Sequence, residues 1–265
     1  MTNLIKSEFY RMIKSKSTYV ILIIFSLLTL VNPLTFKAVF SAKSGHSDAI
    51  SDGTSVYNTT ILNFVEENLS GGVLLLMAVI FMVIYYNAEI NHGYIKSILS
   101  YVGRRKNLAI ANFIVAEITL LAMFILNVAV TSIGSIILLN DIKFGDFSEF
   151  LPWCLIQFLF HSAINALMML LTYLTRSTAL SMTVGICIAS GIPNLIYTLI
   201  TMLGIRYLNF PDTFSLSDYS VSQNIMSLEL DASGNELIRP ILVGVITLAS
   251  AFILSCIVIK KKDIR

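Results

Sequence analysis

Charged residues are scarce in this sequence. Asp, Glu, Lys and Arg make up 13% of the 265 residues, whereas a soluble domain carries about 25%. Hydrophobic residues make up 56%, and the mean hydropathy is +0.80. The excess lies in runs of roughly 18 or more apolar residues, long enough to cross a bilayer core of about 30 Å. The composition therefore excludes an ordinary soluble domain and predicts a polytopic membrane protein.

Cysteines are also few, and no catalytic motif is present. Cys154, Cys187 and Cys256 lie in apolar runs, and their odd number and wide spacing indicate neither a disulfide framework nor a metal site. The motifs HExxH, GxSxG and the phosphate loop GxxxxGK[ST] are all absent. The letters LSGG at residues 69–72 match part of an ATPase signature, but without a phosphate loop we interpret them as small residues for helix packing. We expect no enzymatic activity and no cofactor or metal bound by this chain.

Six apolar runs predict membrane spans. Because only helices and closed barrels satisfy their backbone in lipid, and the runs are too long for barrel strands, we predict an all-α fold. Pro33 is expected to kink the first span, and Pro193 to kink the fifth. A re-entrant hairpin with its tip near Gly191 is the alternative for the fifth. The predicted spans are residues 19–40, 69–86, 108–139, 150–174, 179–204 and 237–259.

The distribution of charge predicts the orientation. One set of alternate segments holds thirteen of the 18 Lys and Arg residues, so this set and both termini are expected to be cytoplasmic. Residues 41–68 and 205–236 then form long extracellular loops. The outer segments hold twelve Asp and Glu against five bases. Such a face would attract cationic ligands, although depletion of bases by the topology rule alone would also produce it.

The N-terminal residues have an amphipathic pattern. Glu8 falls on the apolar side of the helical wheel, against the general pattern. The pattern predicts a helix within residues 1–18 that lies in the membrane interface, and a plain basic flank that sets topology is the alternative. The apolar half holds Leu4, Ile5, Phe9, Met12 and Ile13, and the basic half holds Lys6, Arg11 and Lys14.

Few polar side chains fall inside the spans. Gln157, His161 and Asn165 follow one another at steps of four, with Thr172 further along the same side of the fourth span. This stripe either lines a translocation path or joins helices through hydrogen bonds. Glu117 is the one carboxylate well inside a span. It is either a cavity-facing or coupling residue, or it reaches water at the inner boundary.

A short basic segment separates the second and third spans. Its apolar residues recur at helical spacing, glycines stand at both ends, and three bases follow. The pattern predicts a short cytoplasmic helix that docks on a partner. The apolar face holds Ile95, Ile98, Leu99 and Val102, the glycines are Gly93 and Gly103, and the bases are Arg104, Arg105 and Lys106.

Over its whole length the chain resembles the permease subunits of type-2 ABC exporters that are encoded separately from their ATPase. The sharpest likeness is to the family pattern E-x3-G-x2-K-x2-LS-x4-R after the second span. Asn112 departs from the family, which commonly has a Lys there. Size and layout are similar to the bacitracin, lantibiotic-immunity and amphipathic-peptide exporters of Gram-positive bacteria. The residues that match the pattern are Glu89, Gly93, Lys96, Leu99, Ser100 and Arg105.

The resemblance implies a single transmembrane domain over residues 1–265, with an elbow helix in residues 1–18 and a coupling helix in residues 88–107. The coupling helix would dock on the ATPase, and the turn at residues 175–178 would make a second contact. The docking residues would be Glu89, Gly93, Ile95, Lys96, Ile98, Leu99, Val102, Arg104, Arg105 and Arg176, and the candidate path-lining residues are Glu117, Gln157, His161 and Asn165.

The resemblance also implies a function. We expect a permease of an ATP-driven exporter in the bacterial plasma membrane that moves amphipathic or antimicrobial peptides, for export or self-immunity. Its partners would be two copies of a cytoplasmic ATPase, which binds ATP and magnesium, and a second permease, identical or homologous. Nucleic acid is not an expected partner. A secondary transporter or channel that acts alone is the alternative.

Overall fold

The fold is helical throughout the part of the chain that the structure describes. This computed structural model describes residues 2–43, 59–91, 105–139, 142–208, 211, 214–230 and 234–261. Within these ranges every regular element is a helix and there is no strand. The predicted all-α class is therefore confirmed.

The described part of the chain forms eleven α-helices and one 3-10 helix. The first half of the chain forms α1 (Thr2–Lys14), α2 (Lys16–Thr29), α3 (Val31–Lys43), α4 (Ile61–Ser70), α5 (Val73–Asn91) and α7 (Arg105–Leu138). The second half forms α8 (Phe147–Thr175), α9 (Thr178–Ala189), α10 (Ile192–Leu208), the 3-10 helix η1 (Leu216–Tyr219), α11 (Val221–Ser227) and α12 (Gly234–Lys261). Both predicted outer loops are therefore partly helical, since most of α4 lies within residues 41–68, and η1 and α11 lie within residues 205–236.

Four segments of the described chain are long and apolar enough to cross a membrane. They are Lys16–Val39, Lys106–Leu138, Phe147–Thr175 and Leu237–Lys261. Two bent helix pairs, α4 with α5 and α9 with α10, raise the number to as many as six if each pair is one span. The described chain thus has four to six candidate spans, which is compatible with a membrane protein.

Glycines stand at both bends. The axes of α4 and α5 meet at 47° beside Gly72, and those of α9 and α10 meet at 63° beside Gly191. Gly72 has a φ of +82° and Gly191 a φ of +71°, which residues with a Cβ adopt only at a cost of about 1–2 kcal/mol. The LSGG letters therefore mark a bend. Pro193 is the second residue of α10, within the first helical turn, where its missing N–H costs little.

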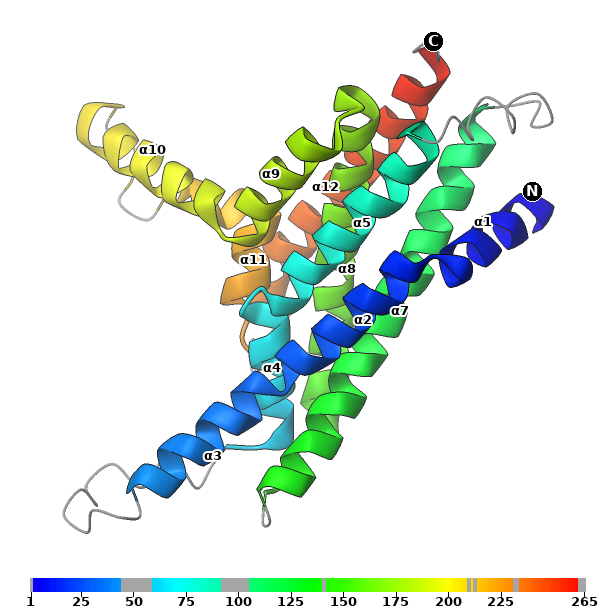
Figure 1. The fold of residues 1–265 in the computed structure, drawn as a ribbon. Coiled ribbons are helices and arrows are strands. Elements are labelled where there is room, and N and C mark those ends of the chain that lie inside the picture. Colours follow the sequence, from blue (N-terminus) through cyan, green and yellow to red (C-terminus); the bar gives the residue numbers. More distant parts are fainter. Residues whose placement is uncertain are drawn as a thin grey trace.

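Helix α8 occupies the centre of the bundle. It packs against α5, α7, α9 and α12 (Figure 1). More than half of its span, 56%, is buried, compared with 17% of the α12 span. α10 instead projects away from the bundle, and Leu195 and Leu199 on it are 68% and 61% exposed. Polar side chains on α8 can therefore meet several neighbours, and so can those on α7, which packs against α1, α2, α3, α4, α5, α8 and α12.

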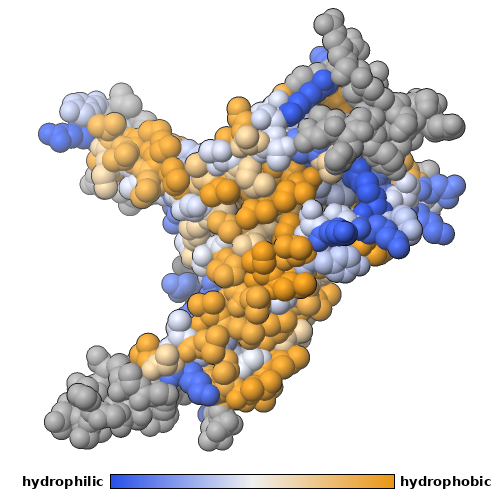
Figure 2. Space-filling model, viewed as in Figure 1, coloured by the Kyte–Doolittle hydropathy of each residue, from blue (hydrophilic) through white to orange (hydrophobic). Residues whose placement is uncertain are grey.

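Apolar side chains dominate the visible surface. Figure 2 shows a broad hydrophobic band over the middle of one face and hydrophilic side chains near its ends. Exposed apolar residues include Ile23 on α2, Ile125 on α7 and Ile246 on α12. Exposure of so large an apolar surface to water is unfavourable, whereas lipid would cover it.

Candidate functional site

One end of the bundle gathers basic residues. The end of α8 and the start of α9 meet at this end, where α7 begins and α12 ends (Figure 1). Its described bases include Lys106, Arg176, Lys260 and Lys261. Most of the predicted docking segment lies outside the described residues, namely Gly93, Ile95, Lys96, Ile98, Leu99, Val102 and Arg104, and so do the side chains of Glu89 and Arg105.

Arg176 lies in the tight turn between α8 and α9. Its φ of 53° places it in the left-handed region, and its backbone N–H donates to the Thr172 carbonyl at 2.9 Å. The Ser177 hydroxyl then accepts from the Leu180 N–H at 3.4 Å and caps α9. The turn is thus fixed at both helix ends and holds Arg176 in a defined position at the basic end.

The N-terminal helix α1 also lies toward this end and packs against α7. Glu8 is completely buried, and Arg11 pairs with it at 2.8 Å. The Arg11 guanidinium lies 4.9 Å from the centre of the Tyr85 ring on α5. A buried carboxylate needs such a partner, which explains why the apolar side of α1 tolerates Glu8.

The polar stripe of α8 faces the interior of this chain. Gln157, His161, Asn165 and Thr172 are each 0% exposed. Gln157 Nε2 donates to the Ile225 carbonyl on α11 at 3.0 Å, so one member of the stripe joins two helices. His161 Nδ1 lies 2.8 Å from the Gln157 carbonyl. Because a carbonyl can only accept, Nδ1 carries the hydrogen.

Three side-chain atoms of this stripe have no hydrogen-bond partner among the described residues. They are His161 Nε2, Gln157 Oε1 and Thr172 Oγ1, and all three are buried. The His161 ring meets the Phe124 ring edge to face, with centroids 5.2 Å apart. Buried polar atoms of this kind normally bind water, an ion or a ligand.

A second part of the stripe surrounds Glu117. Ser162 Oγ donates to Glu117 Oε2 at 2.6 Å, and Asn165 Nδ2 donates to Oε1 at 2.7 Å. The Tyr86 hydroxyl donates to Asn165 Oδ1 at 2.6 Å. These four residues, which we call the carboxylate cluster, join α5, α7 and α8 through one chain of hydrogen bonds.

Both oxygens of Glu117 are satisfied within the carboxylate cluster. Each of its oxygens accepts a hydrogen bond from a neutral donor, and the side chain is only partly buried. A charge at the centre of a bilayer costs at least about 2.5 kcal/mol, and hydrogen bonds to a charged group return about 1.5–3 kcal/mol each. The partly accessible carboxylate can therefore bind a cation or take up a proton.

A third set of polar side chains connects the helices in the other half of the bundle. The sequence patterns did not predict this set. Asn68 on α4 donates to the Thr29 carbonyl at 3.2 Å and to Thr131 Oγ1 at 3.1 Å. Asn32 Nδ2 donates to Asn68 Oδ1 at 3.1 Å, and Thr131 Oγ1 donates to Asn127 Oδ1 at 3.3 Å. We call these residues the amide cluster. It joins α2, α3, α4 and α7 without any charged group.

Pro33 is the sequence signal that could have indicated the amide cluster. The break between α2 and α3 falls at Leu30, three residues before the predicted kink residue. Pro33 has no N–H to donate to the Thr29 carbonyl four residues earlier. That carbonyl is instead satisfied by Asn68.

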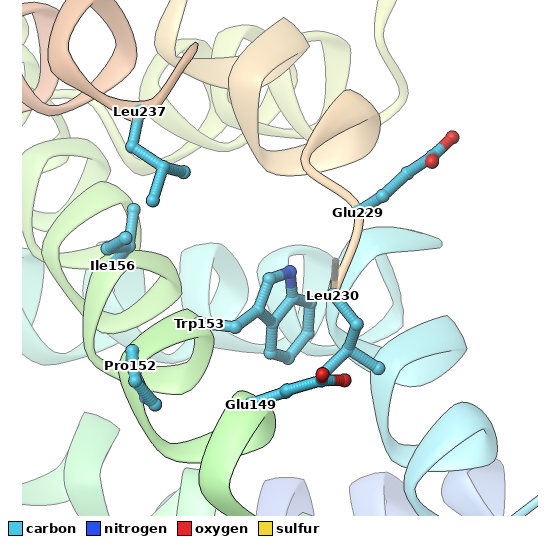
Figure 3. Close-up of a pocket in the computed structure, with 7 residues that line it drawn as sticks. All are labelled: Glu149, Pro152, Trp153, Ile156, Glu229, Leu230 and Leu237. Atoms are coloured by element: carbon cyan, nitrogen blue, oxygen red, sulfur yellow. The ribbon is translucent and has the colours of Figure 1, made fainter. Parts of the chain in front are cut away.

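The end of α8 away from Arg176 carries an open crevice. Its volume is about 290 Å³. Figure 3 shows its lining residues, with Trp153 and Glu149 on α8 and Glu229 and Leu230 in the segment after α11. A second cavity of about 580 Å³ shares Glu149, Glu229 and Leu230 with the first. Pro152, Ile156 and Leu237 complete the lining of the first cavity, and Thr60, Leu62, Asn63, Glu66, Gly145 and Asp146 that of the second.

The loop before α8 fixes this end of the bundle. The carbonyls of Lys143 and Phe144 accept from the N–H groups of Ile61 and Leu62 and so satisfy the start of α4. Asp146 caps α8, where the Ser148 N–H and hydroxyl both donate to its carboxylate. These hydrogen bonds lower the pKa of Asp146 below its usual value.

Comparison with other proteins gives no family. No model of a known protein family matches the sequence, and no curated protein matches it. In the described parts of the chain, no three His, Cys, Asp or Glu side chains lie close enough together to hold a metal ion. The family expected from the sequence pattern therefore enters below as a proposal.

Proposed function

We propose that this chain is the membrane-spanning permease subunit of an ATP-driven exporter, similar to type-2 ABC exporters. The observation that carries the proposal is the pattern E-x3-G-x2-K-x2-LS-x4-R at residues 89–105. It connects α5 to α7, two apolar helices that pack against each other. A cytoplasmic ATPase would bind the segment from Gly93 to Lys106 and drive alternating access.

The basic end of the bundle supports a cytoplasmic position for this segment. The described residues Lys106, Arg176, Lys260 and Lys261 lie with it on the side to which the positive-inside rule assigns the cytoplasm. Both termini would then be cytoplasmic. Arg176, held by the turn after α8, would supply the second contact with the ATPase.

The cargo we propose is an amphipathic or antimicrobial peptide, moved outwards or cleared from the membrane. Two copies of the chain, or one copy with a homologous permease, would form the path. Glu117, Gln157, His161 and Asn165 remain our candidates for path-lining residues. The hydrogen bonds described above join them to other residues of this chain.

The first test is co-purification. The tagged chain is extracted from its native membranes in several mild detergents, and the recovered proteins are identified by mass spectrometry. We expect a stoichiometric ATPase that carries a phosphate loop, with or without a second permease. Recovery of this chain alone in every detergent would overturn the proposal.

A second test addresses the docking face. Replacing Ile98 and Leu99 together by Asp should abolish ATPase recovery, because a charged surface cannot pack into an apolar groove. Ser97→Asp is the matched control, since residue 97 lies on the opposite side of the predicted helix. Loss of binding in the control as well, or persistence of the complex in the double variant, would contradict the assignment.

A secondary transporter that acts alone is the second candidate, and the carboxylate cluster favours it. A partly buried carboxylate between three apolar helices is a common coupling group for protons or sodium. Proteoliposomes distinguish the two functions. Transport that requires the ATPase and ATP supports the exporter, whereas transport that persists without ATP and collapses with the ion gradient supports the secondary transporter.

A further inference from the structure

We propose that the crevice beside Trp153 binds a cationic amphipathic ligand. The positive group would lie between Glu149 and Glu229, and the apolar part would lie against Trp153, Ile156 and Leu237 (Figure 3). That this ligand is a segment of the exported peptide rests on the proposed function, but the site itself does not. The crevice lies at the acidic end, and Trp153 is about 35 Å along α8 from Arg176.

The cavity has the size and the walls of a ligand site. Its volume of about 290 Å³ adjoins one of about 580 Å³, and small-molecule sites fall in the range of about 300–1,000 Å³. One side of the first cavity is formed by an indole, a proline ring and three aliphatic side chains. Such a wall gains free energy by removing an apolar group from water.

The polar side of the crevice is negative. Glu149 and Glu229 border both cavities, and Glu66 and Asp146 line the second. The described lining residues include no Lys or Arg that would neutralise them. Of the neighbouring bases, Arg239 pairs with Asp218 at 2.9 Å. A crevice with low-dielectric walls and one sign of charge concentrates counterions.

The two sides are held in place before any ligand binds. Trp153 is 3% exposed, and its Nε1 donates to the Leu228 carbonyl at 2.9 Å. Glu229 and Leu230 follow directly in the chain, so this hydrogen bond fixes them across from Glu149. The Phe150 and Trp153 rings also pack together, with centroids 5.8 Å apart. Preorganisation of this kind reduces the entropic cost of binding.

Trp153 is an intrinsic fluorescence probe of this site, because it is the only tryptophan in the sequence. The full-length protein in phosphatidylcholine nanodiscs is titrated with N-hexylpyridinium, whose cationic ring quenches indole fluorescence on contact and whose tail is apolar. We expect quenching that saturates. Hexanol, which lacks the charge, and hexyl sulfate, which reverses it, should compete poorly.

Charge variants test the assignment. Combining Glu149→Gln with Glu229→Gln should raise the Kd for N-hexylpyridinium at least tenfold, because two carboxylates lose their attraction for the cation. Glu67→Gln is the matched control, since Glu67 is exposed on α4 and lines neither cavity. Glu229→Lys, a single change at an exposed position, changes the net charge of the crevice by the same amount and should weaken binding to a similar extent. Unchanged emission of Trp153 before titration verifies that each variant is folded.

The fluorescence titration tests the binding site independently of the proposed exporter function. Unsaturable quenching that is equal in all variants, or equal competition by hexanol, would overturn the binding site. The ATPase is absent from the titration, so co-purification of an ATPase without saturable quenching contradicts the site alone. Saturable, glutamate-dependent quenching without any recovered ATPase would support the site and contradict the exporter.

Discussion

The amide cluster and the carboxylate cluster are two sets of hydrogen-bonded side chains between helices, and they differ in whether they contain an ionisable residue. The amide cluster joins α2, α3, α4 and α7 entirely through neutral side chains and backbone carbonyls. Asn68, Asn127 and Thr131 within it are each 0% exposed. The carboxylate cluster joins α5, α7 and α8 around Glu117, which is ionisable and only partly buried.

This difference predicts a structural role for the amide cluster and a functional role for the carboxylate cluster. Neutral amides between apolar helices satisfy one another and add nothing that a ligand could displace, so the amide cluster fixes helix positions. A carboxylate in the same surroundings is costlier and would not be needed for packing alone. We therefore expect substitutions in the amide cluster to change stability and substitutions of Glu117 to change function.

The largest effect is expected for Asn68→Leu. The variant removes the partner of the Thr29 carbonyl and of the Asn32 and Thr131 side chains, and each orphaned group costs about 1–3 kcal/mol. Unfolding in detergent with increasing denaturant should show a loss of about 3 kcal/mol. Ser250→Ala, on the exposed side of α12, is the control and should change little. If the Asn68→Leu variant were as stable as the wild type, the amide cluster would not stabilise the fold.

Glu117→Gln should have the next largest effect, and on transport. The amide still offers an oxygen to Asn165 and can exchange a hydrogen bond with Ser162, so stability should change by less than about 1 kcal/mol. Transport in proteoliposomes should fall about tenfold, the equivalent of about 1.4 kcal/mol. Glu117→Leu should lose both stability and transport. If the Gln variant transported as fast as the wild type, the Glu117 carboxylate would have a structural role only.

Tyr86→Phe tests the far end of the carboxylate cluster. The change removes one neutral hydrogen bond, from the Tyr86 hydroxyl to Asn165, and keeps the ring that meets Tyr173 edge to face. We expect a stability loss of about 1 kcal/mol, measured by the same denaturant titration. A double-mutant cycle with Glu117→Gln should show coupling through Asn165. Strict additivity of the two changes would contradict the connected chain.

The smallest effect is expected at Asp146, outside both clusters. Because its pKa in the folded protein is lowered by hydrogen bonds from Ser148, its contribution is present above the ordinary carboxyl pKa. That contribution is lost as the pH falls through the lowered value. Asp146→Asn retains a good N-cap but cannot titrate, so its thermal midpoint should fall less than that of the wild type below about pH 4. Parallel pH profiles would contradict this role.

Sequence patterns predicted most of the helical framework because hydropathy and helical spacing are local properties. They placed Gln157, His161 and Asn165 on one face, and Glu8 on the apolar side of α1. The bend at Gly191 was predicted only as the tip of a re-entrant hairpin, the alternative for the fifth span, and the bend at Gly72 was not predicted, since it depends on packing around the break. The break near Pro33 was anticipated, but the use of the Thr29 carbonyl by Asn68 was not.

Composition and local patterns account for the all-helical class, the apolar segments, the asymmetry of charge between the two ends and the face on which each polar residue lies. Which of these residues meet depends on how the helices pack. Tyr86 and Asn165 are 79 positions apart, and Trp153 and the Leu228 carbonyl are 75 apart. Contacts at such separations arise from the packing of whole helices, because no local spacing rule specifies which neighbour a buried side chain will face.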